Sequence, residues 1–315
     1  MIVRWGLAEL PGLLREVGIE RPFVIAGPRW RILDLPHVAW WSEVPSHRVE
    51  LPAAADGILA VGGGSAIDTG KFASAQTGKP VVHVPTTYSG AEWTTFYGVR
   101  SPDLILQGGG AGAHPAGIVY DVELTLGLPR SETAGTALNG LAHCAEALYV
   151  RGRSPAGDEQ ALAGARLISD ALPRVLADGS DRAAREDLLR GAMHGGHALG
   201  IAGLALAHAM AQALGSTYGI PHGAMNALCL PPALVFNREL VPAEVSRFGE
   251  AIGGDAVVRT RELAHLGGFE RLRDFGVPEE DLPRVAEAAA GRAGNQANPR
   301  PATTGEILEL LRPIW

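Results

Sequence analysis

One short segment strongly limits the folds open to this chain: an apolar run ends in three consecutive glycines and leads directly into a helical pattern. The run is Ile58–Val61, the glycines are Gly62–Gly64, and the helical pattern starts at Ser65. Glycine lets the backbone approach a phosphate closely, and free N–H groups at a helix N-terminus favour negative charge. Ser65 and Asp68 also have the spacing of a capping box, with Ser65 as the cap. The segment predicts a strand–turn–helix unit of the kind that binds a nucleotide phosphate.

Two well-defined phosphate motifs do not match this turn. In a Walker loop about four residues separate a glycine from Gly-Lys, and Ser or Thr follows. Here five residues lie between Gly64 and Gly70, and Phe72 follows Lys71. The dinucleotide fingerprint needs a third glycine where this chain has Ile67. From the residues alone, a phosphate site and a plain strand-to-helix turn both stay open.

The first part of the chain alternates short apolar runs with helical patterns. We expect helices at Leu7–Val17 and from Ser65 to about Thr77, and strands at Pro22–Ala26, Asp56–Val61, Lys79–Val84 and Ala116–Tyr120. This alternation predicts a parallel, doubly wound sheet, in which ligands bind outside the carboxyl ends of the strands. The glycines and Pro85–Ser89 both follow such ends, whereas the glycine-rich segment Gln107–Gly117 is expected to be a mobile loop.

The pattern changes after Leu128 and Pro129. From Ser131 onward it is helical nearly throughout, with breaks expected at prolines and glycines such as Pro173, Gly215 and Pro231. We therefore expect an α/β dinucleotide-binding domain over residues 1–129 and an all-helical substrate domain over residues 130–315. A cleft between two domains is the usual place for a small-molecule site.

Composition narrows the class of protein. Hydrophobic residues make up 46% of the 315, enough for a sizeable core, and a net charge of −7 argues against a nucleic-acid partner. No apolar run reaches about 18 residues and no signal peptide is visible, so we expect no membrane partner and a cytoplasmic location. Cys144 and Cys229 lie far apart in apolar surroundings and are expected to be buried free thiols.

Histidines are the candidate chemical groups of the helical half. Asn139 and His143 are four residues apart and share a helix face, His208 and Gln212 have the same spacing, and His222 begins a further helix. Three imidazoles with an amide suit a metal ion or a polar substrate. A lone histidine within an apolar helix is usually a hydrogen-bonded core residue, so the pattern leaves this interpretation open beside the functional one.

Several ordered motifs together resemble one family. Gly62–Lys71 is similar to the glycine signature of the iron-containing alcohol dehydrogenase superfamily, as are Pro85–Thr94 and Tyr120–Pro129. Leu138–Tyr149 and Asn298–Pro301 resemble maleylacetate reductases within that superfamily more closely. The resemblance covers nearly the whole chain. It implies a Rossmann-like α/β N-terminal domain and an all-α C-terminal domain, a fold shared with dehydroquinate synthases, with NADH or NADPH bound between them.

The resemblance also assigns roles to single residues of this chain. The pyrophosphate would be held by Gly62, Gly63, Gly64 and Ser65, and the rest of the cofactor groove would be lined by Thr86, Thr87 and Ser89. Asp68 and Lys71 would lie beneath the nicotinamide. In metal-dependent members an Asp and three His bind the cation, and those positions correspond here to Asn139, His143, His208 and His222.

Two positions depart from the metal-dependent pattern. Asn139 replaces the Asp, and a neutral amide is a poorer ligand for a divalent cation than a carboxylate. Maleylacetate reductases resemble this chain in having Asn there. Gln212 stands where many relatives have a proton-relaying His, and Gln does not ionise at neutral pH. We therefore favour catalysis without a metal, and keep iron or zinc on the three histidines as the alternative. Gly27–Leu51 also has little room for a full strand–helix unit at the adenosine end of the cofactor.

The implied reaction is the reduction of maleylacetate, a conjugated keto-diacid, to 3-oxoadipate in the degradation of aromatic compounds. Hydride would add to the alkene carbon remote from the ketone, and His143, His208 and His222 would stabilise the enolate by hydrogen bonds. His222 is the expected proton donor to carbon. Lys71, Arg100 and the histidines are candidate partners of the substrate carboxylates, and Arg29 favours NADPH over NADH.

Three other functions fit the same resemblance. One is a metal-dependent alcohol dehydrogenase or aldehyde reductase, in which a cation on the histidines polarises a carbonyl. Another is a non-redox enzyme similar to the sugar-phosphate cyclases, and the last is a catalytically silent protein. A homodimer is expected because it is the commonest oligomer of soluble enzymes.

Overall fold

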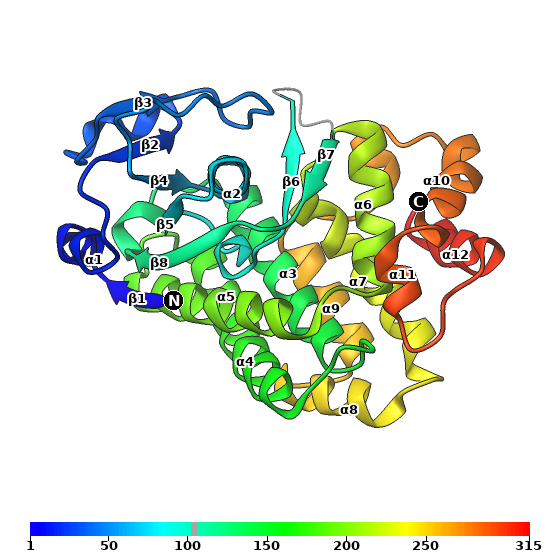
Figure 1. The fold of residues 1–315 in the computed structure, drawn as a ribbon. Coiled ribbons are helices and arrows are strands. Elements are labelled where there is room, and N and C mark those ends of the chain that lie inside the picture. The colour runs from blue at the N-terminus through cyan, green and yellow to red at the C-terminus, as the bar shows by residue number, and fades with distance from the viewer. Residues whose placement is uncertain (102–105) are drawn as a thin grey trace. The chain divides into compact units, whose positions relative to one another are not determined.

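A computed structural model describes residues 1–101 and 106–315, and these form two compact units (Figure 1). The first unit consists of Met1–Thr87 and Ala91–Leu128. The second consists of Tyr88–Gly90 and Pro129–Trp315. The chain therefore leaves the first unit for three residues directly after the predicted phosphate-binding region.

A parallel sheet is the framework of the first unit. Among the described residues it has six strands in the order β1-β8-β5-β4-β2-β3. They are β1 Ile2–Trp5, β2 Pro22–Ala26, β3 Ala39–Trp41, β4 Gly57–Gly62, β5 Pro80–Pro85 and β8 His114–Tyr120. The predicted parallel α/β fold is confirmed. The two edge strands β1 and β3 were not predicted, because runs of four and three residues are too short to show a period of two.

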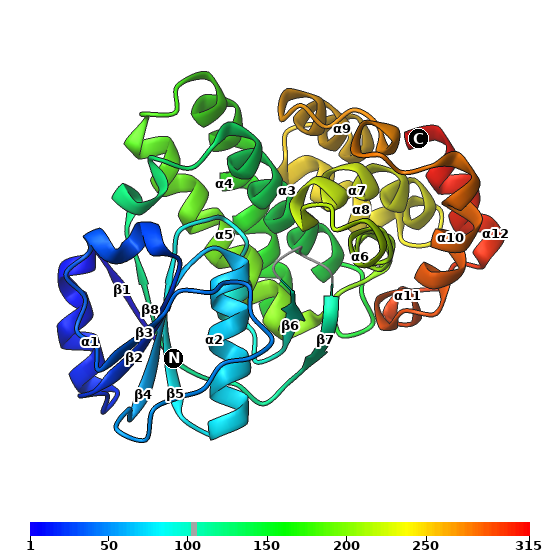
Figure 2. The ribbon, with the colours of Figure 1, turned by 90° about the horizontal axis from the view of Figure 1, so that it is seen from above.

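Opposite faces of this sheet carry separate cores. Helix α1 (Leu10–Glu16) and helix α2 (Gly64–Thr77) lie on opposite sides of the sheet (Figure 2). Alternate side chains of each strand point to opposite faces. One core therefore collects Leu13, Val24, Leu59 and Val82 with α1, and the other collects Ile25, Ile58, Ile67 and Val81 with α2. The glycine turn is thus built from a strand and a helix that are each buried.

The glycine-rich segment after the third predicted strand is not a loop. Strands β6 (Tyr97–Arg100) and β7 (Leu106–Gly110) form an antiparallel pair, and β8 begins at His114. A side chain on Gly109 would lie 2.8 Å from the carbonyl oxygen of Tyr97. The prediction of a mobile loop at Gln107–Gly117 is wrong, because glycine here allows two strands to pack closely.

The described part of the second unit is helical, as predicted. Its helices are α3 Arg130–Ala147, α4 Pro155–Ala177, α5 Arg182–Ala202, α6 Leu206–Tyr218, α7 His222–Arg238, α8 Pro242–Ala251, α9 Ala256–Leu266, α10 Leu282–Ala290, α11 Ala293–Ala297 and α12 Thr304–Leu311. Short 3-10 turns are η1 Leu7–Glu9, η2 Pro28–Ile32, η3 Ala91–Trp93 and η4 Val122–Thr125 in the first unit, and η5 Leu272–Phe275, η6 Glu279–Asp281 and η7 Arg312–Ile314 in the second. The breaks expected at Pro173, Gly215 and Pro231 are wrong, since these residues lie inside α4, α6 and α7.

The two cysteines are buried and unpaired, as predicted. Burial raises the pKa of the Cys144 thiol to about 12, so the thiol stays protonated. In the part of the chain that the structure describes, no single helix has the length and composition of a membrane span, and only α5 and α6 taken together, bent by 100° at their break, pass such a test.

Candidate functional site

The glycine turn joins the carboxyl end of β4 to α2. Gly63 is the N-cap of α2 and has no side-chain capping bond, and Ser65 already lies in the first turn. The Asp68 carboxylate instead forms an ion pair with Lys71 at 2.8 Å and accepts a hydrogen bond from the Gly98 amide at 3.2 Å. The predicted capping box is therefore wrong. The Ala66 amide donates to the Gly63 carbonyl oxygen at 2.9 Å. Because no side chain caps α2, the amides of Gly64 and Ser65 stay available to a ligand.

Close packing requires glycine in this turn. Gly62 has φ +148°, and a Cβ on Gly63 would lie 2.8 Å from Cγ2 of Thr87. The Thr86 amide donates to the Gly62 carbonyl oxygen at 3.0 Å, which places the ends of β4 and β5 side by side. The hydroxyls of Thr86 and Thr87 are buried and have no hydrogen-bond partner among the described residues. Free helix amides beside two unpaired hydroxyls fit the diphosphate of a dinucleotide.

Lys71 does not have the role that the sequence suggested. Its side chain is 1% exposed. The ammonium donates to the carbonyl oxygens of Ala91 and Phe96 at 2.8 and 2.7 Å and to Thr94 Oγ1 at 2.9 Å, besides its ion pair with Asp68. Three N–H groups are thus fully engaged. The prediction of Lys71 as a substrate partner is wrong, and the residue anchors the segment that includes η3.

The segment Tyr88–Gly90 belongs to the second unit and contacts helices α3 and α5 of that unit. The Tyr88 hydroxyl accepts a hydrogen bond from the buried Arg185 of α5 at 3.0 Å. Gly90 has φ +71°, and a Cβ there would lie 2.8 Å from Gly196 Cα. The Ser89 carbonyl oxygen accepts a bond from Asn139 Nδ2 at 3.1 Å. Ser89, expected in the cofactor groove, is therefore placed against Asn139.

The three predicted histidines come together in the second unit. The rings of His143 on α3 and His208 on α6 are stacked with centroids 4.8 Å apart, and His208 and His222 at the start of α7 are 5.6 Å apart. Gly135 and Gly223 permit the close approach of α3 and α7, since a Cβ on Gly223 would overlap the Gly135 backbone. Burial lowers the pKa of His143 well below its usual range, and His208 and His222 lower it further. His143 is therefore neutral at physiological pH.

An amide pair crosses from α3 to α7 beside these rings. Asn226 Nδ2 donates to Asn139 Oδ1 at 2.7 Å and lies 3.0 Å from His222 Nε2. Asn139 Nδ2 lies 3.5 Å from His143 Nε2. Asn226 is fully buried and was not among the predicted residues. Its position four residues after His222, on one helix face, is the signal that the sequence offered.

A buried carboxylate orients the second histidine. Glu146 is fully buried and lies 2.7 Å from His208 Nδ1. It also accepts hydrogen bonds from the backbone amides of Ala205 and His208 at 2.8 and 3.2 Å, at the start of α6. Sequence reasoning missed Glu146. Its signal is an acidic residue three positions after His143, on the helix face that carries Asn139 and His143.

Two further predicted residues, Gln212 and Arg100, belong to different units. Gln212 follows His208 by one turn of α6 and is half-buried. Arg100 ends β6 in the first unit, where burial lowers its pKa and the charge of Asp68 raises it.

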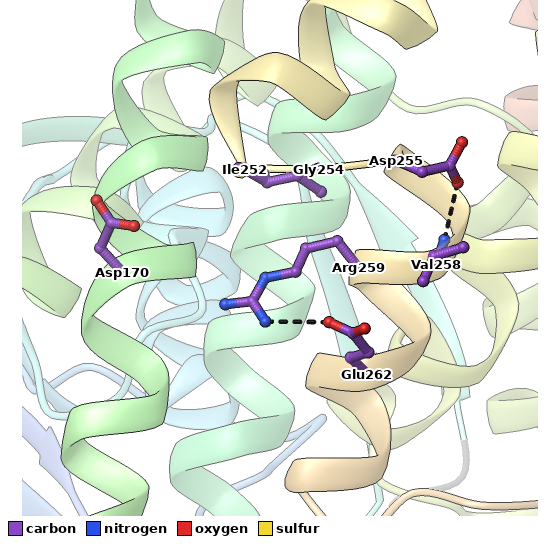
Figure 3. Close-up of a pocket in the computed structure, with 8 residues that line it drawn as sticks. Asp170, Ile252, Gly254, Asp255, Val258, Arg259 and Glu262 are labelled. Carbon is purple, nitrogen blue, oxygen red and sulfur yellow. Dashed lines mark hydrogen bonds and ion pairs between the residues drawn. The ribbon is translucent and has the colours of Figure 1, made fainter.

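A surface cavity of the helical unit does not involve the predicted site. It has a volume of about 340 Å³ and lies between α4 and the start of α9 (Figure 3). Three of its charged side chains are committed to local bonds: Arg259 pairs with Glu262 at 3.2 Å, and Asp255 caps α9 through the Val257 and Val258 amides. The candidate site is therefore the imidazole and amide cluster rather than this cavity.

Comparison with known proteins places the chain. The model of the Fe-containing alcohol dehydrogenase family, C-terminal, matches residues 133–315, and that of iron-containing alcohol dehydrogenase matches residues 50–105. The chain belongs to the iron-containing alcohol dehydrogenase family. It is accordingly an NAD(P)-dependent oxidoreductase, and the predicted Rossmann-like fold is confirmed.

Several relatives of this chain are maleylacetate reductases. That of Pseudomonas knackmussii is 32% identical, over 98% of this chain and 93% of its own length. That of Rhizobium sp. is 36% identical, over 86% and 77%. Among solved structures, maleylacetate reductase from Agrobacterium tumefaciens has a TM-score of 0.88 at 29% identity, covering 100% of this chain and 95% of that one.

The imidazole cluster lacks the geometry of a metal site. The rings of His143 and His208 are stacked, with 15° between their planes. Within residues 1–101 and 106–315, no group of three or more His, Cys, Asp or Glu side chains has the geometry of a metal site. The arrangement therefore suits hydrogen bonding to a substrate better than coordination of a cation.

Proposed function

We propose that the chain is a maleylacetate reductase that uses NADH or NADPH to form 3-oxoadipate. The observation that carries the proposal is Asn139, whose amide is held by Ser89 and Asn226 beside the imidazoles. The maleylacetate reductases that match over most of this chain support the same substrate.

The glycine turn is the proposed cofactor site. The amides of the first turn of α2 and the hydroxyls of Thr86 and Thr87 would hold the diphosphate. A nicotinamide held there would supply the hydride that reduces the alkene carbon remote from the ketone. Everything else in the reaction requires only that this chain bind the substrate, stabilise negative charge and deliver one proton.

Negative charge develops on the ketone oxygen as the alkene is reduced. Preorganised N–H donors aimed at that oxygen lower the barrier, because they are already oriented in a site shielded from water. His208 Nδ1 is occupied by Glu146, so His143 and His222 are the proposed donors. His222 is also the proposed proton donor to carbon. Arg100 and the histidines are the proposed partners for the substrate carboxylates.

We propose that this reduction needs no divalent metal. The support is the neutral amide at position 139 and the stacked geometry of His143 and His208. The rival is a metal-dependent alcohol dehydrogenase or aldehyde reductase, in which a cation would polarise a carbonyl. A structure solved as a putative alcohol dehydrogenase from Ralstonia eutropha has a TM-score of 0.90 at 31% identity. This similarity supports the rival function.

One assay separates the two functions. The purified protein, treated with a chelator, is mixed with maleylacetate and with NADH or NADPH, and the fall in cofactor absorbance is followed. We expect turnover that added iron or zinc does not increase. Absence of turnover with maleylacetate, combined with turnover of simple aldehydes after iron is added, would favour the rival.

The remaining predictions concern the cofactor type, assembly and location. Arg29 follows β2 and its guanidinium lies 4.5 Å from the ring centroid of Trp30, where we propose that it favours the 2′-phosphate of NADPH. A homodimer and a cytoplasmic location are likewise proposals.

A further inference from the structure

The hydrogen bonds around Asn139 can be given directions, starting from one group whose role is fixed. The Ser89 carbonyl oxygen accepts hydrogen bonds and never donates. The Asn139 atom 3.1 Å from it must therefore be the amide nitrogen. The other end of the same side chain, which faces Asn226, must then be the oxygen. The orientation of the amide thus follows from the Ser89 carbonyl group alone.

The direction passes on to the next side chain. An acceptor at Asn139 Oδ1 requires a donor on Asn226, so the Asn226 atom 2.7 Å away is its nitrogen. That nitrogen carries two hydrogens. The second is directed toward α7's own first turn, where His222 Nε2 lies 3.0 Å away and the His222 carbonyl oxygen 3.3 Å away. The shorter contact requires His222 Nε2 to be an acceptor.

A neutral imidazole with an accepting Nε2 carries its hydrogen on Nδ1. We propose that Asn226 is a positioning residue that fixes His222 in this tautomer, so that Nδ1–H is the proton which His222 offers to substrate. Only the catalytic use of that proton rests on the proposed function. The tautomer itself is a property of the free protein.

The local cost of Asn226 agrees with such a role. The side chain is fully buried, and its Oδ1 has no hydrogen-bond partner in the part of the chain that the structure describes. An unpaired buried carbonyl is unfavourable by about 1–3 kcal/mol. A second buried amide of α7, Asn237, shows the contrast, because it exchanges hydrogen bonds in both directions with Asn298. Asn237 is explained by stability alone, whereas Asn226 is not.

The test reads the tautomer directly. Protein with 15N-labelled histidine is studied without substrate by two-bond 1H–15N correlation at a pH of about 8, above the ordinary imidazole pKa of about 6.5. The His222 signals are assigned from their loss in His222→Gln. We expect the hydrogen on Nδ1 in the wild-type protein. A hydrogen on Nε2 would overturn the proposal without any variant being needed.

Variants then test the cause. Asn226→Asp replaces the donor by an acceptor and is expected to move the His222 hydrogen to Nε2, while Asn226→Leu removes the bond and frees the tautomer. Asn237→Asp is the matched control: it alters a buried amide of the same helix and should leave the His222 signals unchanged. An unchanged His222 tautomer in both Asn226 variants, or the same change in the control, would contradict the proposal.

Kinetics separate this inference from the proposed function. With maleylacetate, Asn226→Asp should lower kcat by about 100-fold, the low end of what positioned proton transfer contributes, with little change in KM. An equal loss in Asn237→Asp would indicate a merely structural effect. If the wild-type protein shows the expected tautomer but no turnover of maleylacetate, the proposed function fails and the positioning role stands.

Discussion

At the scale of single residues, Asn139 is central to the candidate site, because its side chain contacts Ser89, Asn226 and His143. Its nitrogen donates to the Ser89 carbonyl and its oxygen accepts from Asn226. A carboxylate in the same place would set two oxygens against each other at the Ser89 contact. The amide is therefore suited to this hydrogen-bond pattern independently of any metal.

This argument predicts an order of stability among variants. Asn139→Asp should lower the free energy of unfolding more than Asn139→Ala, because it buries a charge beside a carbonyl oxygen as well as losing a bond. We expect a loss of about 1–3 kcal/mol for the alanine variant and more for the aspartate variant at neutral pH. Urea denaturation measures both. An aspartate variant as stable as the wild-type protein would contradict the assigned direction of the Ser89 bond.

A second residue-scale prediction concerns acid stability. His83 of β5 is fully buried, and burial together with the charge of Lys71 lowers its pKa to about 3. In the unfolded chain His83 takes up a proton near its ordinary pKa of about 6.5, so between these values the unfolded state binds more protons. Stability should therefore fall as the pH falls below about 6.5, by up to about 1.4 kcal/mol per unit from this group.

Replacing the histidine tests that assignment. His83→Gln should show a smaller loss of unfolding free energy between pH of about 7 and about 5 than the wild-type protein. His265→Gln, a change at an exposed histidine, serves as the control and should keep the wild-type slope. Equal slopes in all three proteins would show that His83 does not contribute.

At the scale of elements, helix termini and turns position the site. Glu146 of α3 accepts the first amides of α6 and holds His208 at the same time. The glycine turn leaves the first amides of α2 without a side-chain cap. The N-terminal amides of α6 are thus hydrogen-bonded within the chain. Those of α2 have no side-chain cap, and we propose that a ligand binds them.

The α6 terminus can be tested through Glu146→Gln. The amide nitrogen of the new side chain would face backbone N–H donors, so we expect the free energy of unfolding to fall by about 1–3 kcal/mol. Glu244→Gln removes a partly exposed ion pair with Arg153 and should cost about 1 kcal/mol or less. Similar losses in both variants would mean that Glu146 is not an essential cap.

The glycine turn can be tested through Gly63→Ala. The added methyl would meet Thr87 at 2.8 Å and displace a hydroxyl proposed to hold the diphosphate. We expect cofactor affinity to fall by about tenfold, or ~1.4 kcal/mol, in a fluorescence titration. Gly12→Ala places its methyl in open space on α1 and should leave the affinity unchanged. Retained affinity in Gly63→Ala would mean that the diphosphate lies elsewhere.

The sequence predicted those elements whose formation depends on the periodicity and spacing of neighbouring residues. The buried strands, the glycine turn and the shared helix face of Asn139 and His143 follow from periodicity and spacing. Contacts between distant segments did not follow. Examples are the engagement of Lys71 by Thr94, the pairing of Glu146 with His208, and the strands β6 and β7, whose glycines resemble a loop until the partner strand is known.

At the scale of the whole molecule, each unit contributes a separate part of the chemistry. The first offers the proposed phosphate-binding turn at the carboxyl edge of a parallel sheet, and the second offers the neutral His143 imidazole and two further imidazoles beside a fixed amide pair. Such a division suits an enzyme that takes hydride from a cofactor and stabilises charge on a separate substrate.

The most direct measurement of the central claim is the identity of the product formed from maleylacetate and NAD(P)H by the chelator-treated protein. NMR of the reaction mixture distinguishes reduction of the alkene from reduction of the ketone. We predict 3-oxoadipate, with the ketone intact and one hydrogen of the cofactor on the alkene carbon remote from it. Formation of a hydroxy acid, or of no product until iron or zinc is added, would contradict the account.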